Sequence, residues 1–276
     1  MARAIEAKFR ALRECGQKAF IPFITAGDPD LDTTARLVAE LARCGSDIVE
    51  LGIPFSDPIA DGPVIQRSSE RALRNGYRMA DYLKAVERIR RETDVPILLF
   101  SYYNPIFQYG LEGLARDARS AGADGVLVTD MTPEESEEYR DCLERHGLDA
   151  VFLAAPTSDD ERIRKIAGCS RGFVYLVSRT GVTGVQESIS ESVVPTLRRI
   201  RAHTDLPVAV GFGVSRPEHV RAIWEFADGA VVGSALVACV EQCRTPDEAL
   251  SQVRDLSLWL TGRRSSAAPQ RSEPRS

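Results

Sequence analysis

The sequence predicts a single α/β domain built as a closed (β/α)8 barrel, the TIM-barrel architecture, with an extra helix at its N-terminus. Three observations predict it. Eight short apolar runs recur along the chain, segments with helical periodicity separate them, and several of these segments end in a glycine of the kind that caps helices. Alternating strands and helices require right-handed crossovers and a parallel sheet, and eight such units in about 250 residues are typical of a closed barrel.

The elements follow from the pattern in chain order. The amphipathic stretch 1–16 predicts the extra helix. The strands are predicted from continuous apolar runs, because a strand buried on both faces has apolar side chains at successive positions. The predicted strands are 19–25, 47–52, 96–103, 124–130, 149–156, 172–178, 206–213 and 228–234. The predicted helices are 31–45, a segment beginning near Pro63, 79–93, 110–123, 133–147, 158–168, 191–204 and 216–227. We expect the barrel domain to span 1–261 and the polar, proline-containing segment 262–276 to be a disordered tail.

A doubly wound open sheet is the alternative that shares this alternation. Such a sheet usually carries a glycine-rich dinucleotide loop directly after its first strand. Here that position reads TAGDPD, which has one glycine where the dinucleotide fingerprint needs three. The sequence therefore favours the barrel.

Composition and charge narrow the class of protein. The 276 residues are 43% hydrophobic and 27% charged, which is ordinary for a folded, water-soluble chain. A net charge of −5 without a basic stripe argues against nucleic-acid or membrane partners. No signal-peptide core and no apolar stretch of about 20 residues is present, so we expect a cytoplasmic protein. The six scattered cysteines are expected to be buried free thiols.

Two carboxylates occupy the end of the second strand and the loop after it. Glu50 closes the apolar run and Asp61 follows eleven positions later in DIVELGIPFSDPIADGP (47–63). The loops after the strands build the active site of such a barrel, so both side chains can lie at one mouth and divide acid and base roles. The structural alternatives are that Glu50 pairs with an arginine and that Asp61 caps the following helix.

Glycine-rich loops follow the last three strands. They read SRTGVTG (178–184), GFGVS (211–215) and GSALV (233–237). Glycines let backbone N–H groups approach an anion, and Ser234 opens a short helix whose N-terminus favours negative charge. Any one glycine alone is more often a turn, but together they occupy the usual phosphate position of a barrel.

The missing groups limit the chemistry. No lysine and no histidine lies at a predicted strand end, so neither a Schiff-base nucleophile nor a catalytic metal site is expected. Cys239 and Cys243 could share a helix face, but no further metal ligands lie nearby in sequence. The class of reaction that the sequence still supports is proton transfer on a phosphate ester. Tyr102 and Tyr175 could add hydroxyl groups to the pocket. Apolar lining suited to an aromatic ring, with core packing as the alternative, could come from Phe23, Phe100, Leu127 and Phe212.

Several motifs together resemble one family. PFITAGDPD (22–30), ELGIPFSDPIADGPVIQ (50–66), APTS (155–158) and VVGSALV (231–237), with the glycine loops above, are similar to the tryptophan synthase α chain over about residues 18 to 240. The resemblance implies cleavage of indole-3-glycerol phosphate to indole and glyceraldehyde 3-phosphate, a reverse aldol reaction. It also implies that this chain needs no cofactor and that a β chain carries pyridoxal phosphate.

The resemblance assigns a role to each matching position. Glu50 would protonate ring carbon C3 and accept the glycerol hydroxyl proton, and Asp61 would hold the indole N–H. The family's phosphate site matches Gly184, Gly213, Gly233 and Ser234. Its indole pocket matches Phe23, Tyr175 and Phe212, and its lid includes Thr183. The surface that meets the β chain includes Asp57 and Asn104, and the expected assembly is an α2β2 heterotetramer. A free-standing lyase and a non-catalytic barrel that activates a partner remain open as alternatives.

Overall fold

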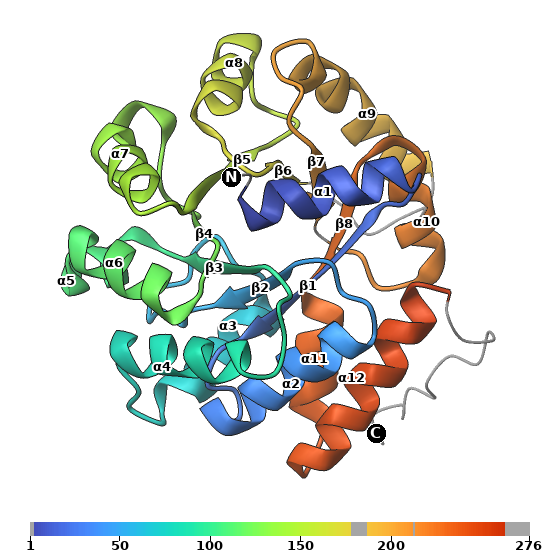
Figure 1. Cartoon of the computed structure of the whole chain (residues 1–276). Helices are drawn as coiled ribbons and strands as arrows, with labels where there is room; N and C mark the ends of the chain where they lie inside the picture. The colour runs from blue at the N-terminus through green and yellow to red at the C-terminus, as the bar shows by residue number, and fades with distance from the viewer. Residues whose placement is uncertain (1–2, 178–186, 212, 263–276) are drawn as a thin grey trace.

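Eight parallel strands close into a barrel in the computed structural model, which describes residues 3–177, 187–211 and 213–262 (Figure 1). Each strand pairs with the next along the chain, and β8 pairs with β1. The strands are β1 (Ala19–Thr25), β2 (Val49–Gly52), β3 (Ile97–Ser101), β4 (Gly125–Val128), β5 (Asp149–Ala154), β6 (Val174–Val177), β7 (Val208–Gly211) and β8 (Gly229–Val232). The predicted (β/α)8 barrel is confirmed, and the open-sheet alternative is wrong.

Helices surround the barrel on its outside (Figure 1). They are α1 (Ala4–Glu14), α2 (Leu31–Arg43), α3 (Pro63–Leu73), α4 (Met79–Arg90), α5 (Tyr103–Tyr109), α6 (Leu111–Ala121), α7 (Glu137–Arg145), α8 (Asp160–Cys169), α9 (Glu187–Arg201), α10 (Pro217–Phe226), α11 (Ser234–Gln242) and α12 (Pro246–Leu260), with a 3-10 turn η1 at Pro133–Glu135. The extra N-terminal helix is confirmed. Two helices, α5 and α12, lie where the sequence pattern predicted none.

The strand predictions placed every strand correctly but extended most of them by a few residues. The run 96–103, for example, shortens to β3, and Tyr103 already begins α5. The predicted helix 133–147 divides into η1 and α7 at Ser136, whose hydroxyl bonds to the Pro133 carbonyl at 2.9 Å. The predicted tail falls outside the described residues except for Gly262.

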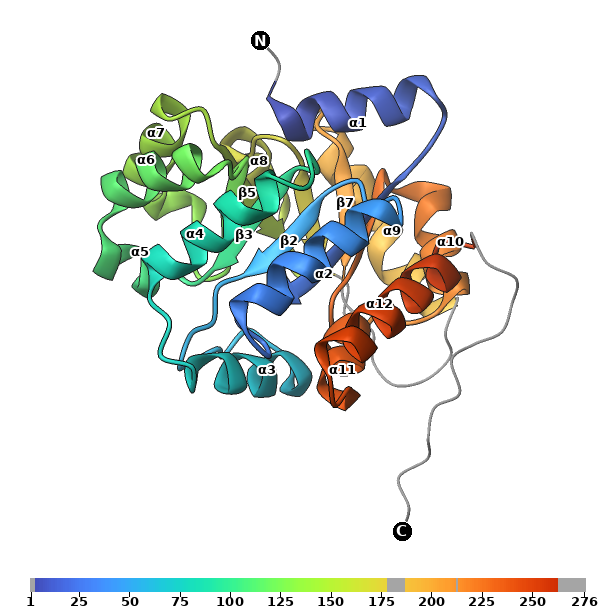
Figure 2. The same ribbon diagram turned by 60° about the horizontal axis from the view of Figure 1, so that its bottom comes forward.

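Apolar side chains fill the inside of the barrel, and α1 covers its amino-terminal end. Ile5 and Phe9 of α1 are buried in the same cluster as interior residues of the strands. The ring of Phe9 lies 5.6 Å from that of Phe173, directly before β6. Arg3, before α1, pairs with the buried Asp149 of β5 at 3.0 Å. Figure 2 shows α1 at this end, with α3 and α11 toward the opposite end, where the strands terminate. The interior is therefore closed at one end.

The cysteines and the helix lengths bear on two further expectations. All six cysteines are free, as expected, but only Cys44 and Cys142 are buried. Cys15 is exposed at the end of α1, and the other three, Cys169, Cys239 and Cys243, are partly buried. None of the described helices has the length and apolar character needed to cross a bilayer.

Candidate active site

Glu50 is the second residue of β2, and its side chain points into the barrel. It pairs in register with Phe23 of β1 and Leu98 of β3, and it is only 1% exposed. Its Oε1 has no hydrogen-bond partner among the described residues. Burial raises the pKa of this carboxyl well above its ordinary value. The arginine-pairing alternative is therefore not supported within the described part of the chain, and burial favours the protonated form of Glu50.

Asp61 is held by a tyrosine from the neighbouring strand rather than by the helix after it. The Tyr102 hydroxyl donates to Asp61 Oδ2 at 3.1 Å and accepts from the Ala60 N–H at 2.9 Å. Burial raises the pKa of Asp61 to about 6, and the tyrosine bond partly offsets that rise. The N-cap of α3 is Gly62, without a side-chain cap. The capping alternative for Asp61 is wrong.

Aromatic rings line a small cavity beside Asp61. Phe23 and Phe100 pack edge to face with ring centroids 5.3 Å apart. Both contribute to the lining of this cavity, which also includes Phe55, Asp61 and Tyr102. Aromatic and aliphatic side chains with one carboxylate among them suit an aromatic ring that carries an N–H group.

Tyr175 lies within the barrel rather than at a strand end. It is buried on β6, and burial, followed by the nearby charges of Glu50 and Asp61, raises its pKa well above the ordinary value. The phenol is therefore close enough to both carboxylates to interact with them electrostatically. The Tyr175 hydroxyl would lie 2.2 Å from a Cβ at Gly211, so only glycine fits opposite it.

Another glycine that the sequence did not single out shapes the same pocket. A Cβ at Gly52 would lie 2.4 Å from the Phe23 ring, so glycine at the end of β2 leaves room for that ring. Its signal in the sequence was present, since Gly52 follows Glu50 by two positions and therefore faces the same side of the strand.

Part of the candidate phosphate site, at Gly213, Gly233 and Ser234, lies within the described residues. Gly213 adopts a left-handed φ of 72°, and Gly233 is the N-cap of α11, directly before the exposed Ser234. The first N–H groups of a helix have no partners within it, so the start of α11 offers donors to an anion. Three predicted residues, Thr183, Gly184 and Phe212, lie outside the described residues.

A histidine that the sequence did not single out supports the loop after β7. His219 of α10 is 6% exposed, and its Nδ1 accepts the Ser215 N–H at 3.3 Å. Ser215 lies two residues after Gly213, so the ring fixes the backbone at the predicted anion site. A histidine four residues after a loop serine was the available signal.

Asp57 and Asn104, predicted to face a partner, lie on neighbouring segments of the surface. Asp57 is exposed in the loop after β2, and Asn104 is exposed at the start of α5. The Phe55 ring lies 5.2 Å from that of Tyr102, which joins this loop to the end of β3. Large apolar side chains are exposed on both segments, with Ile59 at 88% and Phe107 at 66%.

Comparison with known proteins identifies the family. The family model described as tryptophan synthase alpha chain matches residues 9–261. The tryptophan synthase alpha chain of Geotalea uraniireducens (strain Rf4) is 51% identical over 240 residues, covering 87% of this chain and 90% of that protein. That of Solibacter usitatus (strain Ellin6076) is 54% identical over 234 residues, covering 85% and 88%. The chain belongs to the tryptophan synthase alpha chain family. Members of this family are lyases of amino-acid biosynthesis, and this chain is an enzyme of the tryptophan synthase type.

Solved structures of the family share the fold. Tryptophan synthase from M. tuberculosis in its aminoacrylate-bound form superposes with a TM-score of 0.83 at 36% identity, covering 94% of this chain and 98% of that one. The tryptophan synthase complex from Pyrococcus furiosus gives a TM-score of 0.82 at 40% identity, covering 88% and 98%. Another structure from that organism is described as an a2b2 complex. Structural neighbours of this alpha chain are thus tryptophan synthase complexes.

Proposed function

We propose that the chain cleaves indole-3-glycerol phosphate to indole and glyceraldehyde 3-phosphate, with Glu50 and Asp61 as its catalytic residues, and that residues 1–261 act as one catalytic domain. The observation that supports this most is the Glu50 carboxyl, which is buried within the barrel without a hydrogen-bond partner to its Oε1 among the described residues. An unpaired buried carboxyl is destabilising for the fold, and a role in proton transfer explains its presence.

Glu50 acts as the acid and is restored within one turnover. Burial raises its pKa well above the ordinary value and so favours the protonated form, which can donate its proton to ring carbon C3. The bond between C3 and the glycerol carbon then breaks, and its electrons return to the ring to give indole. The hydroxyl on that glycerol carbon becomes the aldehyde and loses its proton to the Glu50 carboxylate. Protons and electrons balance, and the acid is regenerated.

Asp61 stabilises the charge that this step creates. Protonation at C3 makes the ring nitrogen positive, and a carboxylate that accepts its N–H favours that state over the neutral substrate. With a pKa of about 6, Asp61 is mostly ionised at pH 7. Tyr102 keeps the carboxylate in place by its bonds to Asp61 and to the Ala60 N–H.

The remaining predicted residues bind the two ends of the substrate. We assign the phosphate to Gly184, Gly213, Gly233 and Ser234, with the start of α11 supplying backbone donors. The indole ring is assigned to Phe23, Tyr102, Tyr175 and Phe212, and Thr183 to a lid over the site.

A β chain is the proposed partner, in an α2β2 heterotetramer in the cytoplasm. The partner would bind the surface that contains Asp57 and Asn104, where Ile59 and Phe107 expose apolar side chains. Pyridoxal phosphate belongs to the β chain in this proposal, and this chain binds no cofactor. A free-standing lyase with the same residues is the second candidate, because its chemistry is identical and only its dependence on a partner differs.

Indole release by purified variants tests the proposal. Glu50→Gln should lower kcat by on the order of 10²–10⁴, because the amide cannot supply the proton. The matched control is Glu6→Gln on α1, an exposed glutamate at the opposite end of the barrel, which should retain wild-type turnover. Near-normal turnover of Glu50→Gln would refute the mechanism. Turnover that is fast and unchanged by an added β chain would favour the free-standing lyase.

A further inference from the structure

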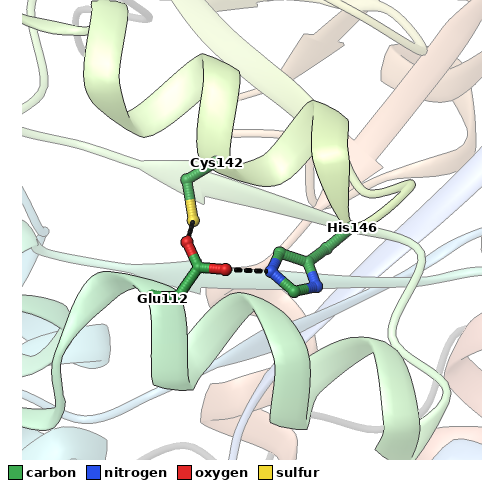
Figure 3. A group of neighbouring side chains, drawn as sticks. All are labelled: Glu112, Cys142 and His146. Carbon is green, nitrogen blue, oxygen red and sulfur yellow. Dashed lines mark hydrogen bonds and ion pairs between the residues drawn. The ribbon is translucent and has the colours of Figure 1, made fainter.

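Three side chains with metal-binding atoms meet between α6 and α7, on the outside of the barrel. Glu112 lies in the first turn of α6, and Cys142 and His146 lie four residues apart on α7 and its C-cap. A spacing of four places both on one face of the helix. Figure 3 shows all three pointing toward one another from the two helices.

The distances show how compact the group is. Cys142 Sγ lies 3.3 Å from Glu112 Oε2, and His146 Nε2 lies 2.6 Å from Glu112 Oε1. The candidate ligand atoms all lie within 4.8 Å of one another. Tetrahedral zinc, with bonds of about 2.0–2.3 Å, places its ligand atoms roughly 3.3–3.8 Å apart. Side-chain movements of about 1 Å therefore suffice to coordinate an ion without moving either helix.

We propose that Glu112, Cys142 and His146 bind one divalent metal ion of the zinc class, with solvent in the fourth position. Sulfur and imidazole nitrogen select zinc and similar ions over magnesium and calcium, which prefer oxygen. The Glu112 side chain is 62% exposed, so the fourth position can face water. On binding, the metal forms bonds to sulfur, nitrogen and oxygen, and the thiol proton leaves to solvent. No oxidation or reduction takes place.

Near the three side chains, one arginine competes with a metal ion for Glu112, and several acidic side chains attract cations. Arg145 donates to Glu112 Oε2 at 2.9 Å, but its side chain is 61% exposed and such exposed ion pairs are weak. A hollow on the adjoining surface is lined by Arg145 and five acidic side chains. These are Glu134, Glu135, Glu137, Glu138 and Asp141. Glu134 is already paired with Arg162 and Lys165, and the negative field of the other four favours cations near the group.

The proposed ion would link two outer helices and would not take part in the reaction. Glu112, Cys142 and His146 lie on the outer helices, whereas Glu50 faces the barrel interior. The group has no local signal in the sequence, because its members lie on two helices and Glu112 and Cys142 are 30 residues apart. The regular Cys-to-Cys or His-to-His spacing of zinc motifs is missing.

Titration of the untagged full-length chain with Co²⁺, followed by competition with Zn²⁺, tests the proposal. We expect one ion per chain and a thiolate-to-cobalt absorption band that Zn²⁺ removes. Cys142→Ser should abolish the band, and His146→Gln or Glu112→Gln should weaken Zn²⁺ binding by roughly tenfold or more. Arg145→Ala should tighten binding, because it removes the competing cation.

The control is Cys15→Ser, which removes an exposed thiol elsewhere and should leave the band unchanged. Circular dichroism and the melting temperature of each variant verify folding. Absence of the band in the folded wild-type chain would overturn the proposal. A band that persists unchanged in Cys142→Ser would also overturn it, because the ion would then be bound elsewhere.

Discussion

Replacement of Asp61 by asparagine should stabilise the fold while it impairs the reaction. The folded chain raises the pKa of this carboxyl from 3.8 to about 6, mainly by burial. Burial therefore disfavours the charged form that exists at neutral pH. Asparagine has nearly the same shape, and its carbonyl oxygen can still accept a hydrogen bond from the Tyr102 hydroxyl. The hydrogen bond that holds the loop after β2 is therefore kept.

The magnitude follows from the shift in pKa. About two pKa units at about 1.36 kcal/mol each set an upper bound of about 3 kcal/mol for the destabilisation by the charged form. The Asp61 side chain is partly exposed, and screening by solvent lowers this bound to about 1–2 kcal/mol. Between about pH 4 and pH 6 the folded chain binds more protons than the unfolded chain, so wild-type stability falls as pH rises through this range. The advantage of Asp61→Asn should be full above pH 6 and should vanish toward pH 4.

Urea unfolding of the isolated chain at pH 7.5 and at pH 5 measures this difference. At pH 7.5 the variant should unfold at a higher urea concentration with an unchanged m-value, and its melting temperature should rise by about 2 °C per kcal/mol. Asp57→Asn is the matched control for stability, because Asp57 is an exposed carboxylate of the same loop. A variant that is no more stable than wild type at pH 7.5, or whose advantage does not change with pH, would refute the reasoning.

Three other substitutions test the supports of the site. Tyr102→Phe removes the hydrogen bond that lowers the pKa of Asp61, so the acid limb of the pH profile of kcat/KM should move to higher pH; an unmoved limb would contradict this. Gly52→Ala places a Cβ 2.4 Å from the Phe23 ring and should lower the free energy of unfolding by about 1–3 kcal/mol in urea titrations, unlike a substitution at an open position. His219→Leu removes the acceptor for a backbone N–H of the phosphate loop, so KM should rise by about fivefold with a smaller change in kcat, and a glutamine at this position should restore KM.

Much of the fold could be predicted because its signals are local. Strands buried on both faces and glycine-capped helices are visible within windows of ten residues. Helix α12 also has a start signal in the sequence, a threonine followed by a proline and, three residues on, a glutamate. In the structure Thr245 accepts the Glu248 N–H, and Pro246 occupies the first turn. Helix α5 had no comparable signal, because Tyr103 continues an apolar run and Pro105 argues against a helix. Tertiary packing decides that segment.

The site was predictable where position along a strand determines it. The sequence predicted a carboxylate at the end of the second strand, and the structure has Glu50 earlier, as the buried second residue of β2. The hydrogen bond between Tyr102 and Asp61 joins residues 41 positions apart, and no local sequence pattern predicts it. The same holds for Tyr175, whose approach to Gly211 depends on how neighbouring strands pair.

The helix α1 has a consequence for the path of the products. It packs Ile5 and Phe9 against the barrel interior, and the ion pair between Arg3 and Asp149 fastens it there. A molecule cannot pass through a packed core, so substrate enters and both products leave by the carboxyl-terminal rim. With a β chain seated on that rim, indole would leave toward the partner and not toward bulk water. Because α1 closes the amino-terminal end of the barrel, the products can be released only at the carboxyl-terminal end.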